Sequence, residues 1–249
     1  MTLNFMVAPD FPPQHFPGWH MLNTVLQRRS GIGLHLLLPS GAGEQAQMVA
    51  EDRVDLVYAN PFDATGLVRD KGFLPVVRPV NRPDEMVIAV AEASPCRTVE
   101  DLRHGNSIVL TDNRDVKLIG LRLIEPADLV EADLAWHEVD SYQAAARQLI
   151  QGKADAAFFL ASAFHSLSRL TRAQMHVVME SRLRDISHVV LAHPRMAPHL
   201  SMVGDALLGL NDDDAGREVL DAVGLGEGFE AIGTEDTEFM IDLMDTLLE

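Results

Sequence analysis

The stretch Arg53-Val54-Asp55-Leu56-Val57-Tyr58-Ala59-Asn60-Pro61-Phe62-Asp63 decides the fold of this chain. Its residues from Val54 to Tyr58, apart from Asp55, are apolar or aromatic, which is typical of a parallel-sheet strand covered on both faces. Pro61 suits the first turn of a helix, because the N–H that proline lacks has no partner there. The stretch therefore predicts a buried strand that ends at Asn60 and continues as a helix. Ligands bind at the carboxyl ends of strands in open α/β sheets, so the turn supplies candidate site residues: Asn60, Phe62 and Asp63.

A second stretch, Gly152-Lys153-Ala154-Asp155-Ala156-Ala157-Phe158-Phe159-Leu160-Ala161-Ser162, repeats this pattern. Asp155 matches Asp55 and Phe158 matches Tyr58. Chance can also produce such a pair, because buried strands followed by helices are common in α/β proteins. The matched acid and aromatic residue favour two similar α/β units, and therefore two lobes with a cleft between them. Ser162 is the candidate hydroxyl at the second strand end.

Expected strands and helices alternate along the chain, which predicts an α/β protein with parallel sheets. The expected strands are residues 3–8, 32–38, 54–58, 73–77, 86–90, 107–110, 134–139, 175–179 and 187–192. The expected helices are residues 18–29, 43–51, 61–70, a helix from 115 that breaks near Pro126, 142–151, and the whole tail from Met196. Segments 79–83 and 182–185 are the expected crossings between the lobes.

Composition excludes several classes of function. Hydrophobic residues make up 47% and charged residues 23% of the 249 residues, as in ordinary globular proteins. The formal charge of −17 disfavours nucleic acid or an anionic membrane as a partner, although it can also serve solubility alone. The single cysteine, Cys96, permits no disulfide within the chain and no cysteine metal cluster.

The sequence begins directly with the expected strand at residues 3–8. It does not begin with the three parts of a signal peptide, which are a charged segment, an apolar segment and a cleavage site of small residues. It also contains no apolar run as long as a membrane span. A cytoplasmic location is therefore expected, or a periplasmic one if a leader has been removed.

Several short motifs follow one another along the chain in a characteristic order. They are the opening strand, Asp55-Leu56-Val57-Tyr58-Ala59-Asn60-Pro61-Phe62, Ser94-Pro95 followed by Val99-Glu100-Asp101-Leu102, the turn Asp140-Ser141-Tyr142, Gly152-Lys153-Ala154-Asp155-Ala156, and a tail from Leu207-Leu208-Gly209-Leu210 to Gly224-Leu225-Gly226. Over nearly the whole chain, this order resembles the type II periplasmic-binding-protein-like family, and most of all its phosphonate- and phosphite-binding branch of ABC-transporter substrate-binding proteins.

The resemblance implies a non-catalytic, small-molecule (solute) binding protein with two α/β sandwich lobes joined by two crossing strands. Lobe I is expected to comprise residues 1–85 and 186–249, and lobe II residues 86–185. The ligand is expected in the interlobe cleft, with the lobes closing over it by a hinge motion. An ABC-transporter permease or a signalling protein is the implied partner, and no cofactor is implied.

The turn at residues 111–115 departs from the family pattern. In the family it is rich in Ser, Thr and Gly, whose hydroxyl and N–H groups hold the phosphonate. Here it carries Asp112, Asn113, Arg114 and Asp115, so carboxylates would repel a phosphonate, whereas Arg114 can pair with an acidic group. Ser141 and Tyr142 keep the family pattern. We therefore expect a ligand with a cationic or polar organic part, which can also bear an acid group, rather than a simple phosphonate.

Other candidates lie beside the first strand. Asp10 is either a cleft acid or a turn former, and Phe11 is either a ligand contact or core; Trp19 is expected in the core. His15 and His20 could form a metal site with Asp10, but their spacing favours loop packing. His188, His193 and His199 are expected at the surface, and no metal site is predicted.

Recognisable catalytic motifs are absent from the sequence, including the Gly-x-Ser-x-Gly elbow, the phosphate loop and His-Glu-x-x-His. Two alternatives remain open: a cytoplasmic enzyme of the same fold, of the dehydratase or lyase type, and a ligand-sensing regulatory domain. No catalytic residue is predicted. The predicted ligand-binding residues are Asp10, Phe11, Asn60, Phe62, Asp63, Asn113, Arg114, Asp115, Ser141, Tyr142 and Ser162.

Overall fold

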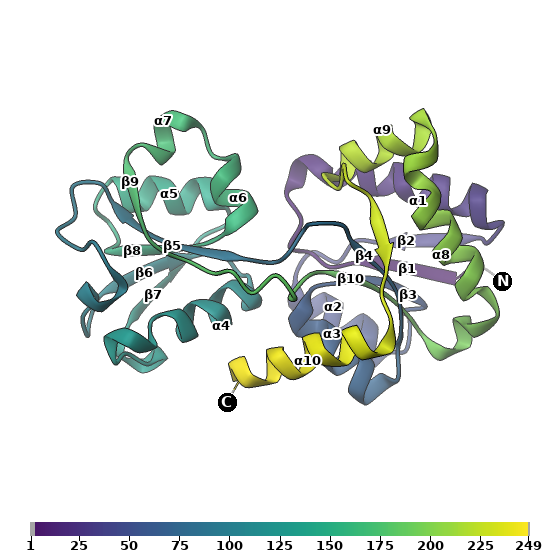
Figure 1. Cartoon of the computed structure of the whole chain (residues 1–249), viewed down its shortest axis with the longest axis horizontal. Coiled ribbons are helices and arrows are strands. Elements are labelled where there is room, and N and C mark those ends of the chain that lie inside the picture. Colours follow the sequence, from purple (N-terminus) through teal and green to yellow (C-terminus); the bar gives the residue numbers. More distant parts are fainter. Residues whose placement is uncertain (1–2, 249) are drawn as a thin grey trace. The chain divides into compact units, whose positions relative to one another are not determined.

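The computed structural model describes residues 3–248, which form two compact units, each built around its own sheet (Figure 1). Unit 1 comprises the chain up to Pro83 together with Ser187–Met244. Unit 2 comprises Asp84–Ile186 and the end of the last helix from Asp245 onward. Every helix in the described part of the chain falls short of the length and hydrophobicity that a membrane crossing needs.

The sheet of unit 1 has six strands in the order β11-β4-β10-β3-β1-β2. Its strands are β1 (Leu3–Val7), β2 (Leu34–Leu37), β3 (Leu56–Ala59), β4 (Leu74–Pro79), β10 (Val189–Ala192) and β11 (Phe229–Ala231). Strand β1 is parallel to both β2 and β3. Strand β10 is antiparallel to β3 and β4, and β11 is antiparallel to β4.

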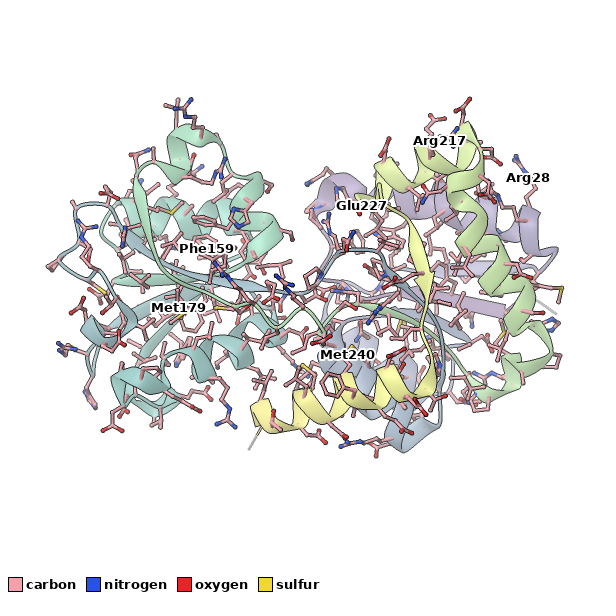
Figure 2. All side chains as sticks on the ribbon, in the orientation of Figure 1. Arg28, Phe159, Met179, Arg217, Glu227 and Met240 are labelled. Carbon is pink, nitrogen blue, oxygen red and sulfur yellow. The ribbon has the colours of Figure 1, made fainter. Side chains whose placement is uncertain are left out.

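Helices cover both faces of this sheet (Figure 1). They are α1 (Phe16–Ser30), α2 (Ala42–Ala50), α3 (Pro61–Lys71), α8 (Leu200–Leu208), α9 (Asp214–Val223) and α10 (Thr234–Leu248). Because side chains alternate along a strand, Phe5 packs with α1, α8 and α9, and Met6 packs with α2, α3 and α10. Met240 of α10 belongs to the second of these cores (Figure 2).

The sheet of unit 2 has five strands in the order β7-β6-β8-β5-β9. They are β5 (Met86–Ala91), β6 (Ser107–Leu110), β7 (Ala135–Glu138), β8 (Ala156–Leu160) and β9 (Met175–Glu180). Strand β6 is parallel to β7 and β8, whereas β5 is antiparallel to β8 and β9.

Helices also cover both faces of this second sheet. They are α4 (Arg114–Leu123), α5 (Tyr142–Ile150), α6 (Ala161–Ser166) and α7 (Arg169–Arg172). Phe158 packs on the α4 side, and its neighbour Phe159 packs on the side of α5 and α6. Figure 2 shows Phe159 on the α5 side of the sheet and Met179 nearer to α4. Short 3₁₀ helices complete the chain: Pro13–His15, Val99–Asp101, Glu125–Ala127, Glu131–Asp133, Pro194–His199 and Gly209–Asp212.

Three expectations about local structure are wrong. The sheets are mixed rather than parallel, because β5 and β10 each follow a crossing segment and enter their sheets in the opposite direction. The tail contains a strand, β11, as well as helices. Helix α1 starts at Phe16 rather than near residue 18. Pro17 fits its first turn, because the N–H that proline lacks has no helical partner there. Its end is as expected, at Gly31 with a φ of 71°.

The matched acids Asp55 and Asp155 play the same structural role in the two units. The carboxylate of Asp55 accepts a hydrogen bond from the N–H of Asn4 at 2.7 Å, and the N–H of Asp55 donates to the carbonyl of Asn4 at 3.1 Å. Asp155 makes the same pair of bonds with Ser107, at 2.7 and 2.9 Å. Each acid therefore joins the start of one strand to the start of the neighbouring parallel strand.

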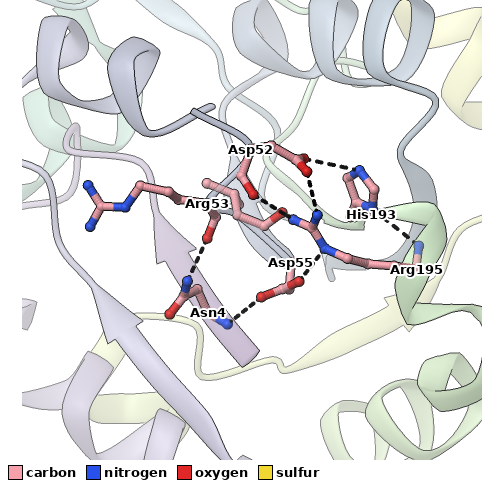
Figure 3. A network of polar contacts seen from close by, with 7 residues as sticks. Asn4, Asp52, Arg53, Asp55, His193 and Arg195 are labelled. Atoms are coloured by element: carbon pink, nitrogen blue, oxygen red, sulfur yellow. Dashed lines mark hydrogen bonds and ion pairs between the residues drawn. The ribbon is translucent and has the colours of Figure 1, made fainter. Parts of the chain in front are cut away.

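Asp55 has a second set of partners (Figure 3). The guanidinium of Arg195 donates to the carboxylates of Asp55 and Asp52 and to the carbonyls of Asp52 and Val54. Burial lowers the pKa of Arg195, but the hydrogen bonds from its guanidinium to Asp52 and Asp55 outweigh burial and raise it. This network lies at the amino end of β3, so it stabilises the unit away from the strand end where Asn60 lies.

Candidate functional site

In unit 1, three strand ends bring polar side chains to one edge of the sheet. Strands β1 and β3 are parallel and end at Val7 and Ala59, and the antiparallel β10 begins beside Ala59 at Val189. The residues that follow or precede these positions are Asp10, Asn60 and His188. The edge is therefore the carboxyl end of the parallel strands, where α/β sheets bind ligands.

Asp10 and His188 form a buried pair. The Nε2 atom of His188 lies 3.3 and 3.2 Å from the two carboxylate oxygens of Asp10, and the side chains are 13% and 10% exposed. Burial raises the pKa of Asp10, but the charge of His188 and hydrogen bonds from His188 and Asn60 outweigh it and lower the pKa. The pair therefore holds a carboxylate inside unit 1. The prediction that His188 is an ordinary surface histidine is wrong.

Aromatic rings support this pair from one side. The ring of His188 stacks on Tyr58 with 4.9 Å between centroids and 20° between planes. Tyr58 contacts Trp19 at 4.9 Å, and Trp19 contacts Phe11 at 5.9 Å. Trp19 is 2% exposed and belongs to the core, as expected, whereas Phe11 is half-buried at the core's edge. The indole Nε1 of Trp19 is buried and has no hydrogen-bond partner among residues 3–248.

Asn60 caps helix α3 and also contacts Asp10. Its side-chain oxygen accepts a hydrogen bond from the N–H of Asp63 at 2.8 Å, and its side chain is also hydrogen-bonded to the Asp10 carboxylate. Asp63 in turn accepts a hydrogen bond from Gln45 of α2. The Oε1 atom of Gln45 is buried without a partner in the described part of the chain. Phe62 and Asp63 are half-buried in the first turn of α3, so the structure gathers Asn60, Phe62 and Asp63 with Asp10 in one region.

In unit 2, the parallel strands β7, β6 and β8 end at one edge, and helices begin there. Asn113 caps α4 by accepting from the N–H of Val116 at 3.0 Å, and Ser141 caps α5 by accepting from the N–H of Ala144 at 3.2 Å. Helix α6 has no side-chain cap, and Ser162 is exposed in its first turn. The remaining predicted residues of this unit follow the caps: Arg114, Asp115 and Tyr142.

The start of α4 combines a positive dipole with a buried acid. Asp115 is 2% exposed in the first turn, where a negative charge is favourable, and its neighbour Arg114 is exposed. Tyr142 packs against Phe159 at 6.1 Å between ring centroids. This edge can therefore offer helix N–H groups, hydroxyls and a guanidinium to a polar ligand, with Asp115 already beside the N-terminus of α4.

Sequence reasoning missed the residues that complete the edge of unit 1: Gln45, Tyr58, Ser187 and His188. Ser187 is buried, and its Oγ atom has no hydrogen-bond partner among the described residues. No local signal points to Ser187 and His188, because they precede a strand whose antiparallel direction the sequence does not indicate. His15 packs against Gly224, while the ring of the exposed His20 makes a tilted contact with Phe16, with 5.2 Å between centroids. Among residues 3–248, no three His, Cys, Asp or Glu side chains gather as metal ligands.

Two α/β units with polar residues at the carboxyl ends of their parallel strands define the class of type II periplasmic-binding-protein-like proteins. The chain belongs to the family of ABC-transporter periplasmic substrate-binding proteins for phosphonate, whose profile matches residues 5–237. Members of this family are solute-binding proteins rather than enzymes; they bind a small ligand and interact with an ABC-transporter permease. The predicted family, fold and non-enzymatic class are therefore confirmed.

Solved structures share the fold at low sequence identity. PhnD1 from Prochlorococcus marinus, in complex with methylphosphonate, is 10% identical with a TM-score of 0.81, covering 99% of this chain and 98% of that chain. A binding component of an ABC phosphonate transporter from Pseudomonas aeruginosa is 14% identical with a TM-score of 0.78, covering 98% and 86%. The aliphatic sulphonate binding protein SsuA from Escherichia coli is 15% identical with a TM-score of 0.64, covering 98% and 87%. No curated protein matches the sequence significantly.

Proposed function

We propose that this periplasmic-binding-protein relative binds a small polar organic molecule with a cationic group, and that a simple phosphonate is not its preferred ligand. The strand-end residues of each unit are its proposed contacts. Asp115 carries the proposal, because its carboxylate is buried in the first turn of α4. A phosphonate approaching this helix N-terminus would meet a negative charge that already occupies the favourable end of the dipole.

Unit 1 supports a cationic group in the ligand. Its candidate region holds the carboxylates of Asp10 and Asp63 and the buried Oε1 acceptor of Gln45, which has no partner among residues 3–248. A ligand ammonium can donate hydrogen bonds to such acceptors, and charge-assisted bonds are stronger than neutral ones. In unit 2, Arg114 and the cap residue Ser141 offer a guanidinium and a hydroxyl that suit an acidic group. We propose that the protein acts in the periplasm and passes its ligand to a permease, as the family does.

Calorimetry and thermal-shift measurements can test this ligand class. We expect an amine-bearing probe, 2-aminoethylphosphonate or a short amino acid, to bind more tightly than methylphosphonate. Asp115→Ser should raise affinity for methylphosphonate by about tenfold, which corresponds to about 1.4 kcal/mol. Arg114→Ala should weaken binding of the probe's acid group.

Asp112→Ser is the matched control for Asp115→Ser, because Asp112 is exposed in the same turn. It should leave both affinities within about twofold, which corresponds to roughly 0.4 kcal/mol. Tight binding of methylphosphonate by the wild-type protein, with no preference for the amine-bearing probe, would refute the proposed ligand class.

A further inference from the structure

Helices α5, α6 and α7 of unit 2 carry a local excess of positive charge in a chain whose formal charge is −17. From Ser141 to Met179 the sequence holds four Lys and Arg residues and one acid, Asp155. That acid precedes β8 and accepts a hydrogen bond from Ser107 at the start of β6, and the next acid, Glu180, pairs with His165. The basic residues are Arg147, Lys153, Arg169 and Arg172. Arg147, Lys153 and Arg169 have no ion-pair partner in the described part of the chain and are exposed.

A hollow of about 420 Å³ lies between α5 and the segment of α6 and α7. Arg147 is the charged residue that lines it, and none of the described lining residues is acidic. Ile150 and Leu167 give the hollow apolar side chains, and the remaining polar side chains are neutral hydrogen-bonding groups: Gln143, Gln151, Ser166, Ser168 and Thr171. Such a lining suits a carboxylate that arrives on an otherwise apolar or neutral segment.

Leu170 adds an apolar contact beside the hollow. Its side chain is 80% exposed, although it stands next to Thr171, which lines the hollow. A single exposed leucine is ordinary on a protein surface. Here it is flanked by Arg169 and by Arg172, whose Nε donates to the carbonyl of Leu167 at 3.2 Å. Arginine is among the residues that protein–protein interfaces favour, and an exposed leucine beside it adds apolar area for a partner to cover.

We propose that this α5–α7 face is a docking surface for an acidic segment of a partner protein. Carboxylates of the segment pair with Arg147 in the hollow and with Arg169 at its rim, and an apolar side chain of the segment packs on Leu170. The inference goes beyond ligand binding, because it concerns the outer helices of unit 2. An extended anionic membrane fits less well, since it would bring the acidic remainder of the protein against like charge.

Fluorescence anisotropy with a labelled peptide of alternating Glu and Leu residues tests the proposal on the full-length protein. The wild-type protein should bind this peptide, and affinity should fall as salt is raised, because exposed charges are screened. Arg147→Gln should weaken binding by about tenfold, and Leu170→Ser should weaken it by a smaller factor. A peptide of alternating Gln and Leu should bind weakly or not at all.

Arg28→Gln supplies the matched control, because Arg28 is an exposed arginine on α1 of unit 1 (Figure 2). It should leave peptide affinity unchanged. The circular-dichroism melting curves of all variants should coincide with that of the wild type, since each substituted side chain is exposed. The proposal is overturned if the wild type does not bind the acidic peptide, if Arg28→Gln weakens binding as much as Arg147→Gln, or if vesicles containing phosphatidylserine bind this face in preference to the peptide.

Discussion

The two matched strands, β3 and β8, begin in the same way and end differently. At their starts, Asp55 and Asp155 make the same two bonds to the neighbouring parallel strand. At their ends, β3 is followed by Asn60, which caps α3, whereas β8 ends with Leu160, which offers no cap to α6. The repeated acid therefore belongs to the architecture of the α/β unit, and the unmatched ends are where the two units can differ in function.

This difference explains why the polar groups of unit 2 lie on other strands. With Leu160 at the end of β8, the caps that could contact a ligand follow β6 and β7, at Asn113 and Ser141. In unit 1, the polar side chain at the end of β3 is joined by Asp10 after β1 and His188 before β10. A duplicated framework thus supports two chemically different edges, one rich in buried acceptors and one rich in helix N-termini.

Removing the matched acids should produce the largest effect on stability and should show how the starts of β3 and β8 differ. Asp55→Ala should destabilise the protein by about 3 kcal/mol, because the buried carboxylate that it removes accepts hydrogen bonds both from Arg195 and from the N–H of Asn4. Asp155→Ala should cost about 1 kcal/mol, since Asp155 is exposed and, within the described part of the chain, its carboxylate accepts hydrogen bonds from Ser107 of the neighbouring strand alone. Urea unfolding of both variants measures the difference.

Asp55→Asn is the control that retains an acceptor for Asn4 while removing the charge opposite Arg195. Its stability should fall between those of the wild type and Asp55→Ala. Equal losses for Asp55→Ala and Asp155→Ala would mean that the network around Arg195 adds nothing to the shared bonds.

The buried pair of unit 1 should give a smaller effect, confined to acid pH. The folded pKa of Asp10 lies below its ordinary value of 3.8, so Asp10 contributes stability that is fully present above that value. The contribution is lost as the pH falls through the folded pKa. For the titration of Asp10 itself, the difference in unfolding free energy between the wild type and Asp10→Asn should therefore stay constant at pH values above the ordinary pKa of 3.8. Below that pH the difference should shrink.

Asp70→Asn is the comparison for this pH series, because Asp70 is exposed on α3. It removes one negative charge without touching His188. If its stability difference from the wild type changes with pH as that of Asp10→Asn does, general charge repulsion rather than the buried pair accounts for the trend.

Local signals in the sequence revealed the framework. Gly31 and Gly72 end their helices with positive φ, and Asn60 and Ser141 cap theirs, because each of these roles depends on neighbouring residues. The direction of β5 and β10 was missed, since strand direction depends on how the chain returns to a sheet. The short β11 was missed for a related reason: it exists only through its pairing with β4.

The partner of Asp10 shows why the site was only partly predictable. His188 lies 178 positions away in sequence, and nothing in the residues around it distinguishes it from a surface histidine. Its burial follows from the antiparallel entry of β10 beside β3. Asp10 and Asn60 could be proposed because they follow expected parallel strands, whose carboxyl ends bind ligands in α/β sheets. No comparable rule points to residues that precede an antiparallel strand.

The smallest expected effect distinguishes a cap from an uncapped helix start. Ser141→Ala should cost about 1 kcal/mol, because the N–H of Ala144 loses its acceptor. Ser162→Ala should change stability by less than about 0.5 kcal/mol, since Ser162 is exposed and α6 has no side-chain cap to lose. Thermal unfolding followed by circular dichroism measures both. A loss of stability at Ser162 as large as that at Ser141 would show that the end of β8 depends on the Ser162 hydroxyl, although this hydroxyl does not cap α6. The contrast between the ends of β3 and β8 would then be smaller than their sequences indicate.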